Sequence, residues 1–182
     1  MKHFIQHRLK RNMRGFTVIE AFVGITILLI GLVGPLMLVN SNLQAGRFSR
    51  DQITAYYLAQ EAIEMVREER DENFIAGRGW LAGLDDCKNS NGCRVDGQVG
   101  VSDPFLSCSG DCTSPRLQVN TTNGRYGYGA GEDSRFYRHV QIDDNVDSIG
   151  GGATVTVTVG FDTGRYIQEY TTTDYLGDWY PQ

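Results

Sequence analysis

The chain has 182 residues, 41% of them hydrophobic and 21% charged, and a formal net charge of −5. Five cations lie within residues 1–15, so residues 16–182 carry 12 Lys and Arg against 22 Asp and Glu, a formal charge of −10. So acidic a composition argues against general nucleic-acid binding, which would need a clustered basic surface, and we predict no nucleic-acid partner.

The first predicted element is a basic leader, residues 1–15, which contains no acid. An apolar transmembrane segment follows at about 18–39, and the nineteen residues from Ala21 to Val39 carry no charge. Nineteen helical residues are enough to cross roughly 30 Å of hydrocarbon. Because positive charge stays in the cytoplasm, we expect a single-pass protein of the cytoplasmic membrane, with a cytoplasmic N-terminus and an extracytoplasmic C-terminal domain.

Glu20 places a carboxylate at the start of this apolar run. A charge at mid-bilayer costs roughly 2.5 to 3.5 kcal/mol on insertion scales, and such a residue usually has a partner or a function. One candidate partner is Arg14, if both side chains reach the membrane interface. The other is the α-amine that a cut between Gly15 and Phe16 would create, which is largely protonated at neutral pH. In two chains packed side by side, that amine could pair with the neighbour's Glu20.

The stretch GFTVIE, from Gly15 to Glu20, stands behind the basic leader and before a long apolar helix, and it resembles the prepilin signal of type IV pilins and type II secretion pseudopilins. Val18 stands where leucine is commoner in that family. The resemblance implies that a prepilin peptidase removes residues 1–15, that the new terminal Phe16 is N-methylated, and that Glu20 docks subunits into a filament. The implied partners are other pilin or pseudopilin subunits, the peptidase and the assembly machinery of the inner membrane, and assembly would place the chain in a cell-surface filament.

Residues 16–73 are predicted to form one long helix, because no proline follows Pro35 and apolar residues recur every three or four positions in the later half. That stripe consists of Ala55, Leu58 or Ala59, Ala62, and Met65 or Val66. Gly31, Gly34 and Pro35 predict a kink or local unwinding in the membrane half. The segment YYLAQEAIEMVREERDENF, with FYRHVQI further on, is similar to minor pilins of the PilV type and to I-type pseudopilins, which favours an accessory subunit.

Residues 74–182 are predicted to form one exported domain, in which an antiparallel sheet at about 116–178 packs on the helix. The expected class is therefore α+β, with a pilin-like architecture. LQV and RYGYG flank the turn TTNG as a hairpin, and ATVTVTV alternates as a half-buried strand.

The segment FYRHVQI also alternates, with Phe136 and Val140 on an apolar face and Tyr137 and His139 on a polar face. Arg138 falls on the apolar face in this register. We therefore expect Arg138 either at the edge of that face or paired with an acid, which the sequence alone does not identify.

Four cysteines, Cys87, Cys93, Cys108 and Cys112, lie in loops at about 85–115. An even number in an exported domain favours disulfides, and local pairing is the simplest of three connectivities. A zinc site is the rival interpretation. A loose calcium loop that uses Asp85 or Asp86 is a further alternative, although Cys87 and Gln98 stand where an EF-hand has acids. We predict no metal and no cofactor.

We predict that the protein is not an enzyme. After leader removal the only histidine is His139, and no GxSxG elbow accompanies it to suggest a Ser/His/Asp triad. The glycines of GRYGYGAG lead into no predicted helix, so a phosphate-binding loop is not expected. Tyr175, Trp179 and Tyr180 are expected to close a small core rather than to stack against a sugar.

Two classes of function remain. In the first, the chain is a minor pilin or pseudopilin that joins a filament for assembly, adhesion, motility, DNA uptake or protein secretion, and the sequence leaves pilus and secretion system open. In the alternative, it is an uncut, membrane-anchored receptor or adhesin. The state of the bond between Gly15 and Phe16 distinguishes the two.

Overall fold

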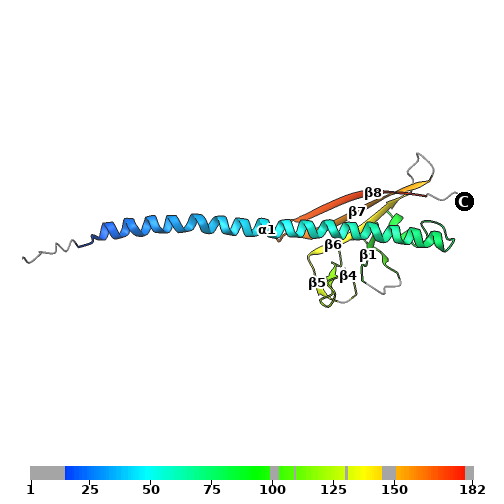
Figure 1. Ribbon diagram of the computed structural model, residues 1–182, viewed down its shortest axis with the longest axis horizontal. Coiled ribbons are helices and arrows are strands. Elements are labelled where there is room, and N and C mark those ends of the chain that lie inside the picture. Colours follow the sequence, from blue (N-terminus) through cyan, green and yellow to red (C-terminus); the bar gives the residue numbers. More distant parts are fainter. Residues whose placement is uncertain (1–14, 99–102, 109, 130, 145–150, 179–182) are drawn as a thin grey trace, which may run out of the picture. The chain divides into compact units, whose positions relative to one another are not determined.

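The structure is a computed structural model that describes residues 15–98, 103–108, 110–129, 131–144 and 151–178. It contains one long helix and two antiparallel sheets (Figure 1), which confirms the α+β class. The chain divides into two units, residues 1–46 and 47–182. Apart from Gly15, the predicted leader lies outside the described residues.

Helix α1 spans Val18–Ile75, close to the predicted 16–73. Its backbone stays helical through Gly31, Gly34 and Pro35, so the local unwinding expected there is not observed. A proline removes one hydrogen bond of the helix, and the bonds on both sides can hold the turn together. Within residues 18–46 the side chains are exposed apart from Ala21, and α1 there is long and apolar enough to cross a membrane, by length and composition.

In the second unit, α1 has one buried face. Ala55, Leu58, Ala59, Ala62, Ile63 and Val66 are buried, and Met65 is half-buried. The stripe predicted from three- and four-residue spacing is therefore confirmed. Alanines dominate it, so the sheet side chains can approach the helix backbone closely.

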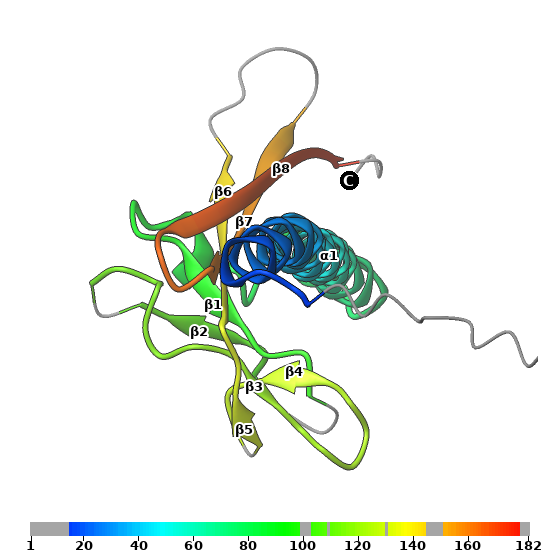
Figure 2. The same cartoon turned by 90° about the vertical axis from the view of Figure 1, so that its left-hand side faces the viewer.

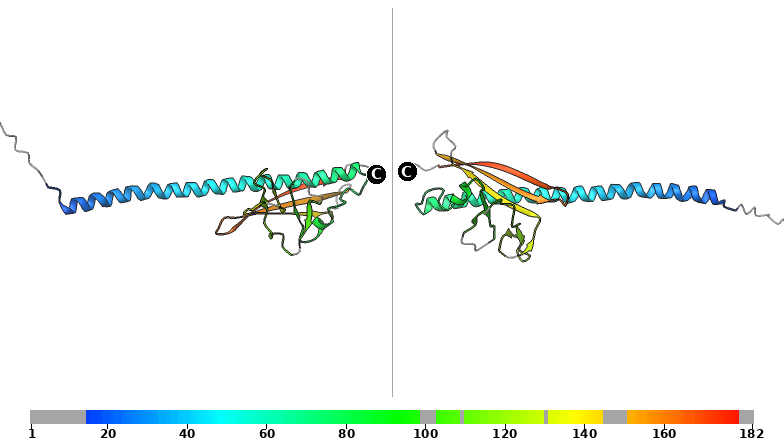
Figure 3. Two further views of the ribbon diagram at one scale, coloured as in Figure 1. Left: turned by 90° about the horizontal axis from the view of Figure 1, so that it is seen from below. Right: turned by 180° about the vertical axis from the view of Figure 1, so that it is seen from behind.

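The larger sheet has the strand order β2-β1-β6-β7-β8, and every neighbouring pair is antiparallel. Its strands are β1 (Cys93–Val95), β2 (Phe105–Ser107), β6 (Phe136–Asp143), β7 (Gly152–Asp162) and β8 (Ile167–Gly177). These strands gather beside the second half of α1 (Figure 3), and residues from both form one core. Val155, Val157 and Val159 are buried in it, each contributing roughly 1.5 to 3 kcal/mol.

The predicted sheet began at about 116, and that limit was wrong. Strands β1 and β2 come from the segment expected to be loops, at about 85–115. Each has three residues, too few for a period-two pattern to show in the sequence. They form because Cys93 pairs with Val140 of β6, and β2 then pairs with β1.

A smaller sheet has the order β4-β3-β5. Its strands are β3 (Gln118–Val119), β4 (Tyr126–Gly127) and β5 (Glu132–Asp133). Strands β3 and β4 form the hairpin predicted around TTNG, with Gly124 at a positive φ of 72°. Figure 2 shows this sheet set apart from β7 and β8.

Candidate functional site

The start of α1 holds the three residues that the prepilin resemblance singles out. Gly15, Phe16 and Glu20 are all exposed, and a side chain at Gly15 would meet nothing within 4 Å. The neighbouring apolar side chains are uncovered as well: Phe16 is 75% exposed and Val18 89%. The fold therefore leaves the predicted cleavage bond accessible and the surface around Glu20 without internal cover.

Thr17 caps this helix, a role that the sequence analysis missed. The backbone N–H of Glu20 donates to Thr17 Oγ1 at 3.3 Å, and the N–H of Ala21 donates to the Thr17 carbonyl at 3.1 Å. A threonine at the cap with a glutamate three residues later is a known helix-start pattern, and the spacing T-x-x-E could have revealed it. Glu20 thus lies in the first turn, where the helix dipole stabilises negative charge.

Glu20 forms no ion pair among the described residues. Arg14, the cation considered for it, lies outside them, and pairing between two chains is a property that a single chain cannot display. Within the described residues, its place in the first turn of the helix is therefore what favours the charge of Glu20.

Arg138 is the largest fully buried side chain of the second unit. Its Nη1 donates to Glu61 Oε2 at 2.6 Å and to the Leu58 carbonyl at 2.9 Å, while Nη2 donates to the Val95 carbonyl at 2.8 Å. Of the two expectations for Arg138, the edge position is wrong and the pairing with an acid is confirmed. One guanidinium thus joins α1, β1 and β6.

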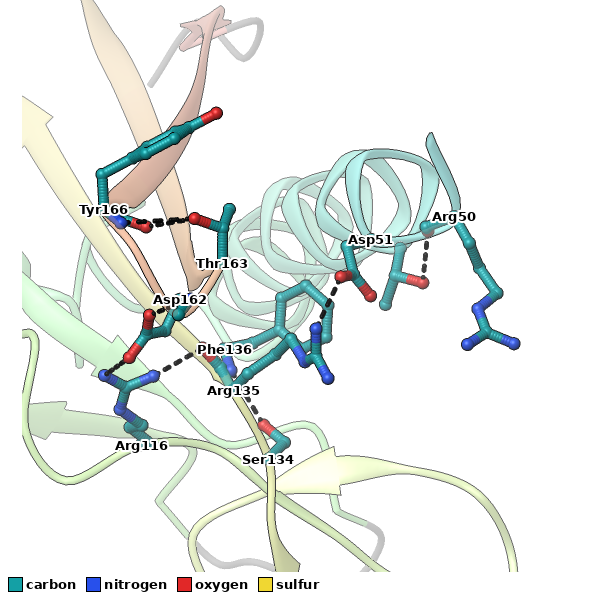
Figure 4. A network of polar contacts seen from close by, with 11 residues as sticks. Arg50, Asp51, Arg116, Ser134, Arg135, Phe136, Asp162, Thr163 and Tyr166 are labelled. Atoms are coloured by element: carbon teal, nitrogen blue, oxygen red, sulfur yellow. Dashed lines mark hydrogen bonds and ion pairs between the residues drawn. The ribbon is translucent and has the colours of Figure 1, made fainter. Parts of the chain in front are cut away.

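Two more ion pairs tie α1 to the sheet. Arg135 Nη1 lies 2.9 Å from Asp51 Oδ2 at the beginning of the second unit (Figure 4), and Arg67 Nη2 lies 2.7 Å from Asp174 Oδ2 further along. Other charged residues of this helix, Glu64, Glu68, Asp71 and Glu72, are exposed. The partners of Asp51, Glu61 and Arg67 come from distant parts of the chain, so only the fold reveals them.

Asn73 fixes the segment that follows the helix. Its side chain is fully buried, donates from Nδ2 to the Ala82 carbonyl at 2.6 Å, and accepts from Arg78 Nε at 2.6 Å. A lone asparagine in a run of charges gives no signal of such a role in the sequence.

Both disulfides are local, Cys87–Cys93 and Cys108–Cys112, which is the pairing expected as the simplest. Oxidised sulfurs cannot serve as thiolate ligands, so the rival zinc site on these cysteines is excluded. For the calcium alternative, Asp85 pairs with Lys88 at 3.1 Å, and no cluster of three metal-binding side chains occurs in the described part of the chain.

His139 lies on the polar face, as predicted, and its ring stacks on Tyr137 with centroids 6.4 Å apart. Burial lowers the pKa of His139, and its Nδ1 has no hydrogen-bond partner among the described residues, so no carboxylate orients the ring as a triad would require. Tyr137 was expected to face solvent but is 2% exposed, because it lies over Gly160 and donates to Glu169. Burial raises the pKa of Tyr137.

Tyr175 does not close a core: its side chain is 54% exposed, which corrects the expectation for it. Strand alternation explains the difference, because Leu176, its neighbour, takes the buried position on β8. Trp179 and Tyr180 lie outside the described residues.

The start of α1 is therefore exposed, apolar and capped by Thr17. The second unit is held together by a buried arginine and two disulfides. Comparison with protein-family models, with curated proteins and with solved structures finds no match to this chain.

Proposed function

We propose that the chain is a filament subunit, a minor pilin or pseudopilin that a prepilin peptidase cuts between Gly15 and Phe16. The mature chain would carry an N-methylated Phe16 and assemble through α1 into a type IV pilus-like filament. One observation carries the proposal: Glu20 is exposed in the first turn of a helix whose apolar surface the chain's own fold does not cover.

The uncovered surface requires an apolar environment outside the chain. None of the most apolar eighteen-residue window of α1 is buried in the structure. Before assembly, a bilayer meets this need, with the N-terminus in the cytoplasm and the body outside. After assembly, the same surface would be covered by α1 helices of neighbouring subunits.

Cleavage would also give Glu20 a partner. A cut after Gly15 places a protonated amine, with an ordinary pKa of about 7.7 to 8, next to the cap residue Thr17. Positive charge at a helix N-terminus is unfavourable, and a carboxylate at that place offsets it. In a bundle of such helices, the neighbour's Glu20 provides this carboxylate in a low-dielectric setting, where the attraction is strongest.

The second unit would then display a surface for assembly, adhesion, motility, DNA uptake or protein secretion. Its ion pairs to α1 involve Asp51, Glu61 and Arg67, so the sheets of the second unit are attached at three points along their own segment of the helix. These contacts would hold the displayed surface in a fixed position on residues 51–67 of α1.

The alternative function is an uncut, membrane-anchored receptor or adhesin. The Thr17 cap favours it, because capping and the helix dipole explain a glutamate at this position within a single chain. In that case Glu20 would have no neighbour to bind, and the leader would remain as a cytoplasmic tail.

The two functions are separated by a substitution at the cleavage site. We expect Gly15→Val to block processing, because the peptidase must accept a small residue before the cut. Gly24→Val is the matched control, since Gly24 also has open space around it and lies nine residues further on. N-terminal sequencing of chains extracted from the native membrane should find Phe16 first in the control and Met1 first in Gly15→Val. Phe16 termini in both variants would refute the assigned site.

A further inference from the structure

Charge is distributed unevenly over the second unit. Residues 47–182 contain 12 Lys and Arg against 21 Asp and Glu, a formal charge of −9. Five of the arginines nevertheless lie at one end, which we call the basic end: Arg47, Arg50, Arg116, Arg135 and Arg165. Two of them are paired with acids, Arg116 with Asp162 and Arg135 with Asp51.

Contacts bring Arg116 and Arg135 together beside Asp51 of α1 (Figure 4). Arg135 pairs with Asp51 of α1, and Arg116 donates to the Arg135 carbonyl at 2.9 Å and lies 3.3 Å from Asp162. Asp162 ends β7, and the turn that follows carries Arg165 before β8 begins. Phe48 of α1 packs on Phe161 of β7 with ring centroids 6.0 Å apart, and this contact holds the middle of the helix on the sheet.

Three of the five arginines form no ion pair with other described residues of the chain. Arg47, Arg50 and Arg165 are exposed and form no ion pair in the described part of the chain. Beside Arg165, Tyr166 is 56% and Ile167 53% exposed. Free cations next to an exposed tyrosine and isoleucine are the combination that membrane–water interfaces attract.

We propose that the basic end binds anionic phospholipid headgroups at the outer surface of the membrane that holds the apolar segment of α1. Arg47 follows Val39 by eight residues, all helical, a rise of about 12 Å. Arg47 is thus tethered close to the membrane, and the unpaired arginines of the basic end would be attracted to an anionic surface. Each cation near an anionic surface strengthens binding by about fivefold.

Lipid contact would fix the orientation of the second unit on the bilayer. The inference depends on membrane anchoring but not on cleavage, because Arg47 and the rest of the basic end are present in cut and uncut chains alike. Its failure would leave the filament proposal intact, and failure of the filament proposal would leave it intact.

The test uses the full chain in nanodiscs, once with phosphatidylcholine alone and once with about 30% phosphatidylglycerol. Hydrogen exchange is followed in a peptide that covers residues 162–168. We expect exchange there to slow by about fivefold or more in the anionic discs, and the difference to vanish at about 0.5 M salt, which screens exposed charges. Equal exchange in the two kinds of disc at low salt would overturn the proposal.

A pair of charge-matched variants makes the test specific. Arg50→Gln with Arg165→Gln should remove most of the protection, whereas Arg78→Gln with Lys88→Gln, outside the basic end, should leave it. Protection that survives in the first variant would contradict the proposal. So would equal protection in neutral discs by inorganic phosphate or by duplex DNA, since either would show an anion or nucleic-acid site instead of a lipid one. Thermal unfolding of both variants controls for loss of the fold.

Discussion

Helix α1 is one element with two kinds of surface. From Phe22 to Val39 it is apolar on all sides apart from Thr26, and no described residue of the chain covers it. Downstream, a narrow stripe around Ala55, Ala59 and Ala62 faces the sheet and charged residues occupy the other faces. A helix that is hydrophobic all round must be covered from outside, whereas a stripe is covered from within. The first half is therefore where the chain meets its surroundings, and the second half is where it holds itself together.

Two glutamates of the same helix show this difference in charge. Glu61 accepts a hydrogen bond from buried Arg138 at 2.6 Å, so its partner is within the chain. Glu20 forms no ion pair with any described residue, and its place in the first turn of α1 favours its charge. In the filament proposal, the partner of Glu20 belongs to another copy. Loss of the Glu20 carboxylate should therefore lower assembly and spare stability, whereas loss of the pair between Glu61 and Arg138 should lower the stability of the second unit.

The largest effect is expected from Glu20→Ala. Incorporation into sheared surface filaments should fall by about tenfold or more, because the amine of a neighbour loses its counter-charge in a low-dielectric setting. Processing and stability of the second unit should stay unchanged. Quantitative immunoblots of filament and membrane fractions measure the effect.

Thr17→Ala is the control for this prediction, because it removes the cap and keeps the carboxylate. We expect this substitution to lower the stability of the helix by about 1 kcal/mol and to leave incorporation into filaments nearly unchanged. If Thr17→Ala lowered incorporation as much as Glu20→Ala, helix capping rather than docking would explain Glu20.

The next effect concerns the body alone. Arg138→Met should lower the free energy of unfolding by about 3 kcal/mol, because Glu61 and two backbone carbonyls lose their donor. Arg67→Met removes a half-buried pair with Asp174 and should cost about 1 kcal/mol or less. Denaturant unfolding followed by tryptophan fluorescence compares them. Equal costs would show that the buried arginine is not a principal support of the body.

The two disulfides should also differ in how much they stabilise the fold, with the more deeply buried one contributing more. Cys87→Ala with Cys93→Ala opens a bridge whose two cysteines are fully buried in the core, and we expect a loss of about 2 kcal/mol. Cys108→Ala with Cys112→Ala opens a shorter loop that is less deeply buried, with an expected loss of about 1 kcal/mol. Thermal unfolding with and without reductant provides the measurement, and the reverse order would contradict the depth argument.

The smallest effect is a pH dependence. Burial lowers the pKa of His139, while nearby Glu169 acts in the opposite direction. The unfolded chain, whose histidine titrates near pH 6.5, therefore binds the proton more readily than the folded chain. Stability should be complete above about pH 6.5 and decline as the pH falls below it. His139→Gln should flatten the stability profile between pH 5 and 7, and an unchanged slope would refute the assignment.

The sequence predicted the features that depend on local pattern. The stripe of α1, the alternation of Val155, Val157 and Val159, and the TTNG hairpin each repeat at the spacing of their element, and the structure confirms them. Short strands β1 and β2 escaped because three residues show no period.

Features made by tertiary contact could not be predicted in this way. The partner of Arg138 is 77 residues away in the chain, and the burial of Tyr137 depends on Gly160 leaving room for its ring. At the candidate site, Gly15, Phe16 and Glu20 came from consecutive residues, and the one missed group, Thr17, was also local. The basic end draws Arg116, Arg135 and Arg165 from three separate connecting segments, so the sequence alone does not reveal it.

The most direct test of the central claim is the intact mass of the wild-type chain, with N-terminal fragmentation, after isolation from native membrane or from sheared surface filaments. We predict a chain that begins at Phe16 and carries one additional methyl group. A chain that still begins at Met1 would contradict the filament assignment, leave Glu20 as a capping carboxylate, and favour the membrane-anchored receptor or adhesin.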